Sequence, residues 1–303
     1  MKVFASLANL CRGFAMGSAD VVPGVSGGTV AYILGIYPRL LAAITAIGPG
    51  SLMLVFRGKW RRAWQGADAG FLLALGIGIV LAVLFFTRVI PIPLLLKTHP
   101  QQVYGLFFGL IVGSLIVLGR ELGRHSLADL AWLIAGVGLG LAVVNLVPMN
   151  MPHTAPYVFL SGVVAITAML LPGISGSFIL LILRQYGYVM DAIGSLRLSV
   201  IAPFLVGCLV GMMLFSRILR WLLTIFPRRT RMVINGLLVG SLWAVWPFQQ
   251  REFITVREKA RLISSQPVWP DNLDDTVLMA LALAVIGVLG VVALGRFARL
   301  KTS

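Results

Sequence analysis

Long apolar runs divide the chain into segments of membrane-spanning length. Six runs approach or exceed the roughly 20 residues that an α-helix needs to cross a bilayer. They cover residues 70–90, 101–119, 127–147, 199–222, 230–248 and 276–295. None shows the alternating ten-residue segments of a membrane β-barrel. The pattern therefore predicts six spanning helices and an all-α polytopic membrane protein.

Two further apolar regions, residues 3–47 and 155–195, are each interrupted near the centre by a glycine-rich sequence. The first interruption reads PGVSGG and the second PGISGS. Proline removes a backbone donor and disfavours helix in the residue before it, and glycine adds freedom that a helix must freeze. Each region is therefore expected to be a helix, a break and a second helix. It either enters and leaves on one side as a re-entrant hairpin or crosses the membrane as a broken helix.

The two interruptions belong to an internal repeat. Three blocks match in the same order: PGVSG at 23–27 with PGISG at 172–176, FTR at 86–88 with FSR at 215–217, and GLIVGSL at 109–115 with GLLVGSL at 236–242. We predict two duplicated halves, residues 1–150 and 151–303. Each half is expected to contain one broken hairpin followed by three spanning helices.

The charges fit this topology. Only 12% of the residues are charged, whereas a soluble domain has about a quarter. The net charge of +15 comes from basic residues in short loops, such as RGKWRR at 57–62, which is typical of cytoplasmic loops rather than of a nucleic-acid-binding surface. If the N- and C-termini are cytoplasmic and both hairpins are re-entrant, most basic residues lie on the cytoplasmic side of the membrane. Because three spans is an odd number, the second half is then inverted relative to the first.

The chemistry of the two breaks indicates an anion site. A helix begins after each break, with free amide groups and a partial positive charge at its start. Ser26, Thr29, Ser175 and Ser177 add hydroxyl groups. These features suit a phosphate or a carboxylate. The simpler alternative is a tight turn with a serine N-cap, but two symmetric copies at membrane depth favour the binding site.

Charged residues within apolar sequence are further candidates. Asp20 precedes the first break and has Met169 as its counterpart; it is expected either to carry a coupling proton or to form a buried ion pair. Arg88 and Arg217 are repeat equivalents that either receive an anionic headgroup or extend towards the interface. Arg39 is a weaker candidate. We include all three arginines among the predicted substrate-binding residues.

Signals for catalysis and cofactors are missing from the sequence. Two cysteines and three histidines show no metal-ligand spacing, and no nucleotide-binding, HExxH or GxSxG motif occurs. We predict no catalytic residue, no metal and no cofactor. Transport would then be passive or coupled to an ion gradient, with H⁺ or Na⁺ as the coupling ion.

The segments GSADVVPGVSGGTVAYILGIYPRL (17–40) and LLPGISGSFILLILRQYGYV (170–189) resemble the signatures of the polyprenyl-phosphate transporter family. The resemblance implies a multi-pass protein of the bacterial inner membrane that returns undecaprenyl phosphate from the outer to the inner leaflet for cell-envelope glycan synthesis, including peptidoglycan. Arg184 stands where we expect a less bulky or neutral residue. The substrate-binding residues carried over by motif are Asp20, Pro23, Gly24, Ser26, Gly27, Gly28, Thr29, Pro172, Gly173, Ser175, Gly176 and Ser177.

Two other functions remain open at this point. Undecaprenyl-pyrophosphate phosphatases also use paired re-entrant hairpins with a PGxS-type motif. They carry an arginine and a second serine just after that motif and a glutamate-rich helix, whereas this chain has Gly27 and Gly28 and no glutamate in its spans. An ion-coupled transporter of a small organic anion is the second alternative.

Overall fold

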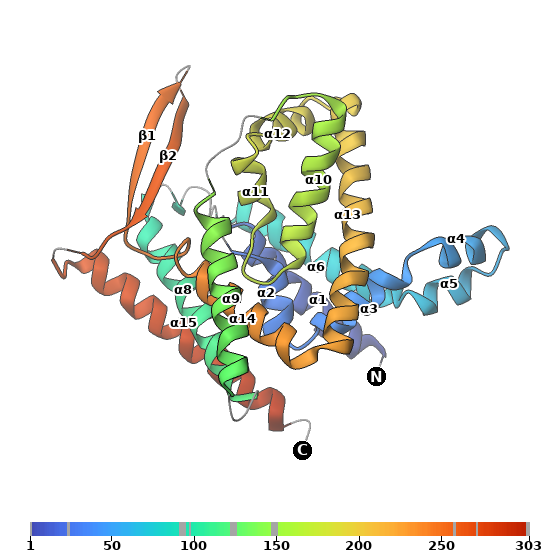
Figure 1. The fold of residues 1–303 in the computed structure, drawn as a ribbon, viewed down its shortest axis with the longest axis horizontal. Helices are drawn as coiled ribbons and strands as arrows, with labels where there is room; N and C mark the ends of the chain where they lie inside the picture. Colours follow the sequence, from blue (N-terminus) through green and yellow to red (C-terminus); the bar gives the residue numbers. More distant parts are fainter. Residues whose placement is uncertain are drawn as a thin grey trace.

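The computed structural model describes residues 2–22, 25–90, 95–96, 98–121, 126–146, 151–256, 259–270 and 272–300. It is mostly helical, which confirms the predicted polytopic membrane architecture in its coarse form (Figure 1). The helices that are long and apolar enough to cross a membrane are α6 (Ala69–Arg88), α8 (Pro100–Glu121), α9 (Leu127–Val144), α13 (Leu198–Ile225) and α15 (Asp275–Leu300).

Each predicted broken region contains a second bend in addition to the expected break. The first consists of α1 (Lys2–Asp20), α2 (Gly27–Ile33) and α3 (Tyr37–Ala46), and the second of α10 (Ala155–Leu170), α11 (Gly176–Ile182) and α12 (Tyr186–Gly194). Helices α2 and α3 are bent by 118° relative to one another. Gly35 lies in that bend with a φ of 67°, and Arg184 lies in the corresponding bend with a φ of 51°. The unexpected arginine thus occupies a left-handed position where its repeat counterpart is glycine.

Close helix pairs recur at equivalent positions of the repeat. Helix α1 packs on α6, and α10 packs on α13. In the first pair Gly13 lies against the backbone of Leu75, and in the second Gly162 lies against the backbone of Phe204. The sequence repeat aligns Gly13 with Gly162 and Leu75 with Phe204. The two pairs therefore share one register, set by glycines that let the backbones touch.

The two halves exchange helices. Helix α8 of the first half packs on α15 of the second, while α9 of the first half packs on α14 (Pro227–Ser241) of the second. Gly109 lies against the backbone of Ala284, and Gly236 lies against the backbone of Leu133. A side chain at either glycine would collide with the partner helix. Residues 1–150 and 151–303 are therefore interlocked along two glycine-lined interfaces.

The region from residue 230 to residue 275 differs most from the prediction. The apolar run 230–248 was expected to span, but α14 ends at Ser241, and Pro247 disfavours helix just before it. The polar segment that follows forms an antiparallel hairpin of β1 (Gln249–Val256) and β2 (Lys259–Pro267), whereas the sequence predicted helices alone. In Figure 1 this hairpin rises at the end of the molecule opposite the two labelled chain termini.

Candidate functional site

The two breaks meet in the interior of the molecule. The Ser26 hydroxyl donates to the Met169 carbonyl oxygen at 3.3 Å, and the Gly173 amide donates to the Thr29 hydroxyl oxygen at 2.9 Å. Ser26 and Thr29 are 1% and 2% exposed, so these contacts are shielded from the surroundings. The structure thus joins residues 143 and 144 positions apart in the sequence, through Ser26 and Gly173 of the two PGxSG motifs and through Met169 and Thr29 beside them.

At the first break, the protein itself supplies a carboxylate to the start of α2. Asp20 accepts a hydrogen bond from the Gly27 amide at 2.7 Å, and the Ser26 hydroxyl caps the helix by accepting from the Gly28 amide at 3.1 Å. Two of the amides expected to face a ligand are therefore occupied by internal partners. Pro23 and Gly24, also predicted to bind substrate, lie outside the described residues.

The second break is built from the same residue types but is bonded differently. Pro172, Gly173 and Gly176 are buried. Gly173 has a φ of 96°, and its α-carbon faces the Leu237 carbonyl on α14 so closely that a Cβ would lie 3.0 Å from that oxygen. The Ser175 hydroxyl does not cap α11 but lies 2.9 Å from the Ser177 hydroxyl.

One residue that the sequence did not indicate also joins the two broken regions. Tyr37 is fully buried, and its hydroxyl donates to the Leu170 carbonyl oxygen. The repeat aligns Tyr37 with Tyr186, which could have drawn attention to this position, but the alignment does not indicate what the side chain contacts. The phenol ties the start of α3 to the end of α10.

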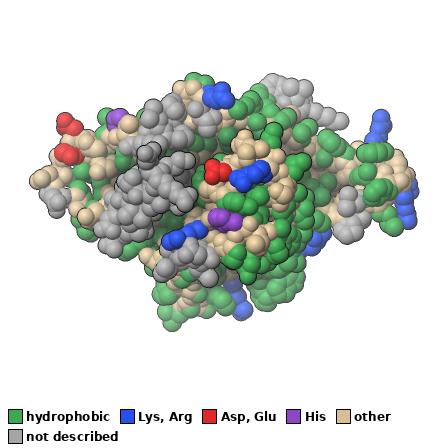
Figure 2. Space-filling view, turned by 90° about the horizontal axis from the view of Figure 1, so that it is seen from above, with side chains coloured by type: hydrophobic (Ala, Val, Ile, Leu, Met, Phe, Trp, Pro, Cys, Tyr) green, Lys and Arg blue, Asp and Glu red, His purple; other side chains and the backbone are tan. Residues whose placement is uncertain are grey.

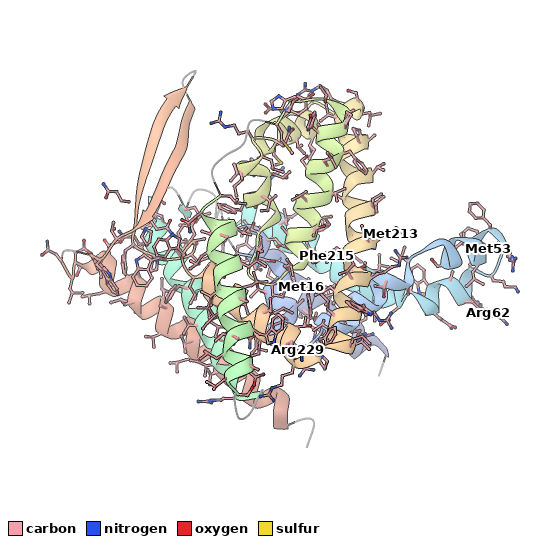
Figure 3. The ribbon with its side chains drawn as sticks, viewed as in Figure 1. Met16, Met53, Arg62, Met213, Phe215 and Arg229 are labelled. Carbon is pink, nitrogen blue, oxygen red and sulfur yellow. The ribbon has the colours of Figure 1, made fainter. Side chains whose placement is uncertain are left out.

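The three arginines predicted to bind substrate are not brought to the breaks. Arg39 forms a two-pronged ion pair with Asp68 at 2.7 and 3.2 Å and stacks over Phe71. Arg88 is exposed at the end of α6. Arg217 is exposed on α13, donates to the Met213 carbonyl of its own helix and lies close to Gly48. The side chains of α13 near this point are drawn in Figure 3.

A cavity of about 500 Å³ lies between α8, α9 and α14. Its walls are mostly aliphatic, as at Leu115 and Leu130. Asn235 also lines it, and the side-chain oxygen of Asn235 is buried and has no hydrogen-bond partner among the described residues. Asn235 and Leu237, on which Gly173 rests, are two positions apart on α14 and therefore lie on nearly opposite faces of that helix. Nothing in the sequence distinguished this cavity from ordinary helix packing.

An ion pair stands at one end of the cavity. Asp129 receives two hydrogen bonds from Arg228, at 2.9 and 2.7 Å, and also accepts from the Ser126 amide at the start of α9. The hydrogen bonds to this carboxylate raise the pKa of Arg228 above its usual range. The pair joins α9 to α14 across the two halves. In the described part of the chain, no three His, Cys, Asp or Glu side chains are grouped so as to hold a metal ion.

Comparison with known proteins places the chain in a family. Residues 16–263 match the model of a family described as undecaprenyl phosphate translocase-like. A polyprenyl-phosphate transporter of Vibrio cholerae serotype O1 is 40% identical over 250 residues, covering 82% of this chain and 80% of the relative. A polyprenyl-phosphate transporter of Staphylococcus aureus is 34% identical over 258 residues, covering 79% of this chain and 86% of the relative. No solved structure matches the chain.

These matches extend over most of the chain, and the match to the family model includes both breaks. With five apolar helices of spanning length in its described residues, the protein is a multi-pass membrane protein, and it belongs to the undecaprenyl phosphate translocase-like family.

Proposed function

We propose that this protein translocates undecaprenyl phosphate from the outer to the inner leaflet of the bacterial cytoplasmic membrane, so that the lipid carrier is reused in cell-envelope glycan synthesis. The family match and two relatives named polyprenyl-phosphate transporters support the substrate class. A transporter, rather than a phosphatase or a small-anion carrier, is the function these names favour.

The observation that carries the mechanism is the direct contact between the two breaks. The hydroxyl and amide groups that join them are groups that also hydrogen-bond phosphate oxygens. We infer that a phosphate headgroup inserts between the PGxSG motifs and replaces the Thr29–Gly173 and Ser26–Met169 bonds. Because these groups are buried, losing their mutual bonds without a ligand is costly, and the phosphate offsets that loss.

The proposed access route alternates between the two leaflets. The first hairpin is taken to enter from the cytoplasm and the second, in the inverted half, from outside. Labelled N- and C-termini at one end of the molecule and the β-hairpin at the other support this orientation (Figure 1). The helix exchange constrains the motion, because rocking whole halves would separate the α8–α15 and α9–α14 contacts. We therefore assign the movement to the hairpins, within a frame held by those two helix pairs.

The isoprenoid tail needs apolar surroundings while the headgroup crosses. The aliphatic cavity between α8, α9 and α14 supplies such surroundings, and one of its walls is α14, the helix that Gly173 contacts at Leu237. We propose that the part of the tail nearest the phosphate lies there, with the remainder in lipid.

The direct test is labelling of undecaprenyl phosphate at the cell surface after depletion of the protein. We expect the carrier to accumulate in the outer leaflet and to return to its normal level when the wild-type protein is restored. An unchanged outer-leaflet pool, in cells that lack any other carrier-recycling protein, would refute the proposed function. Release of inorganic phosphate from undecaprenyl pyrophosphate by the purified protein would instead favour the phosphatase alternative.

A further inference from the structure

Helices α4 (Pro49–Phe56) and α5 (Trp60–Gly66) form a two-helix arm that projects sideways from the bundle (Figure 1). A glycine turn at Gly58, with a φ of 71°, folds α5 back along α4. Around Gly50, Gly58 and Gly66 no other atom lies where a side chain would extend, so the arm has free space on several sides. Seen from above, the arm again extends beyond the rest of the molecule (Figure 2).

The arm exposes large apolar side chains that a water-facing loop would bury. Phe56 is 88% exposed and Trp60 is 65% exposed, and Met53 and Trp64 are each more than half exposed. Figure 3 shows Met53 near the far end of the arm. Exposed aromatic and aliphatic residues concentrated on a short helical element are typical of a segment that lies in a membrane interface.

The same arm carries a dense positive charge. Arg57, Lys59, Arg61 and Arg62 are all exposed. The sequence contains no acidic residue between Asp20 and Asp68, and neither ion pair in the described part of the chain involves these four side chains. Tryptophan favours the headgroup level of a bilayer, and clustered Lys and Arg beside it attract anionic lipids.

We propose that the arm lies in the headgroup layer on the basic side of the membrane and binds the phosphates of bulk anionic phospholipids. Trp60 and Trp64 enter the boundary between headgroups and acyl chains, while the four basic side chains contact lipid phosphates. The arm connects α3 of the first hairpin to α6, so this contact anchors one end of that hairpin to the bilayer surface. The inference does not depend on which molecule the protein transports.

Tryptophan quenching by brominated lipids tests this placement on the full-length protein in nanodiscs. The arm signal is the quenching of tryptophan fluorescence in the wild-type protein minus the quenching in the Trp60→Phe/Trp64→Phe variant. We compare nanodiscs containing a minor fraction of brominated phosphatidylglycerol in phosphatidylcholine with the same fraction of brominated phosphatidylcholine in phosphatidylglycerol. We expect the anionic quencher to be about tenfold or more as effective, since each basic residue near an anionic surface adds roughly a factor of five.

Two charge variants separate the arm from the overall charge of the protein. In the first variant, the two brominated lipids are expected to quench the arm signal equally. This variant replaces four residues by Gln: Arg57, Lys59, Arg61 and Arg62. The matched control removes four basic residues elsewhere in the predicted cytoplasmic segments, Lys2, Arg120, Arg231 and Arg299, also as Gln. This control should retain the preference for phosphatidylglycerol.

Three results would overturn the proposal. Quenching of the arm signal by aqueous iodide and not by lipid would place the arm in water. Equal quenching by the two brominated lipids in the wild-type protein would leave only an apolar contact. Relief of quenching by a small fraction of unbrominated undecaprenyl phosphate, far below the phosphatidylglycerol needed for the same relief, would make the arm a site for the transported lipid instead of for bulk phospholipid.

Discussion

The two breaks share a sequence motif but differ in the side chains that accept hydrogen bonds from the amides at the start of the following helix. At the first break Asp20 binds the Gly27 amide and Ser26 caps α2. At the second break the position equivalent to Asp20 is Met169, and Ser175 leaves α11 without a side-chain cap. The first break thus holds an internal anion where the second has a thioether. We infer that an incoming phosphate meets repulsion from Asp20 on one side and none on the other, so the two motifs act as unequal halves of one site.

Gly173→Ala should have the largest effect, because it affects the contact between the breaks directly. The residue has a left-handed φ, which costs a non-glycine residue about 1–2 kcal/mol, and its new Cβ would press on the Leu237 carbonyl. We expect loss of translocation in proteoliposomes and a lower midpoint of thermal unfolding. Gly187→Ala is the control, because Gly187 lies on α12 with free space around it. If Gly173→Ala translocates as well as Gly187→Ala, the second break is not held in the conformation described here.

Met169→Asp makes the second break resemble the first. The Cβ of Met169 is adjacent to Gly176, so the new carboxylate can reach the amide equivalent to that of Gly27. We expect the affinity for a fluorescent undecaprenyl phosphate analogue in nanodiscs to fall about tenfold or more, since a hydrogen bond to a charged group contributes roughly 1.5–3 kcal/mol. Met169→Asn, which has the same shape and no charge, should bind nearly as the wild type. Equal affinities for the two variants would contradict the inferred asymmetry.

Thr29→Val and Ser175→Ala compare a hydroxyl that joins the breaks with one that does not. Valine removes the acceptor of the Gly173 amide and leaves that buried donor without a partner, which costs about 1–3 kcal/mol. Among the described residues the Ser175 hydroxyl bonds to that of Ser177, across the same turn, so its loss should change the free energy of unfolding by less than about 1 kcal/mol. Chemical denaturation of the purified protein measures both. The comparison fails if Ser175→Ala is the more destabilising change.

Tyr37→Phe and Tyr186→Phe test whether the bend after the first break is tied down more firmly than its repeat counterpart. Tyr37 is fully buried and donates to Leu170, whereas Tyr186 is only partly buried. We expect Tyr37→Phe to destabilise the protein by about 1 kcal/mol and Tyr186→Phe to have a smaller effect. Thermal unfolding in detergent gives the difference. Equal effects would show that the phenol contact is not the source of the asymmetry.

Arg39→Gln should have the smallest effect. Its ion pair with Asp68 is about half exposed, and such pairs contribute roughly 0.2–1 kcal/mol. Because Arg39 is held by Asp68 and Phe71 away from the breaks, we expect translocation close to that of the wild type. A severe loss of translocation with normal stability would return Arg39 to the substrate-binding residues.

The sequence by itself determined the class of the protein and the positions of both breaks. Apolar runs of spanning length require a membrane, and the clustered Pro and Gly of PGVSGG and PGISGS interrupt the helix in each apolar region. Each of these two signals depends on neighbouring residues only. The repeated motif was visible as well, because it needs only a comparison of two short segments of the sequence. The sequence did not predict the second bend at Gly35 and Arg184, because no local pattern indicates that an arginine adopts a positive φ.

Only the tertiary structure decided which groups meet. The bond from Gly173 to Thr29 and the packing of α8 on α15 and of α9 on α14 join residues distant in the chain. Asp20 also reaches the Gly27 amide across the first break. Such contacts depend on how helices with several acceptable apolar faces pack together. That choice is made by the close fit of glycine-lined surfaces and by the need of buried polar groups for partners, neither of which a single helix specifies.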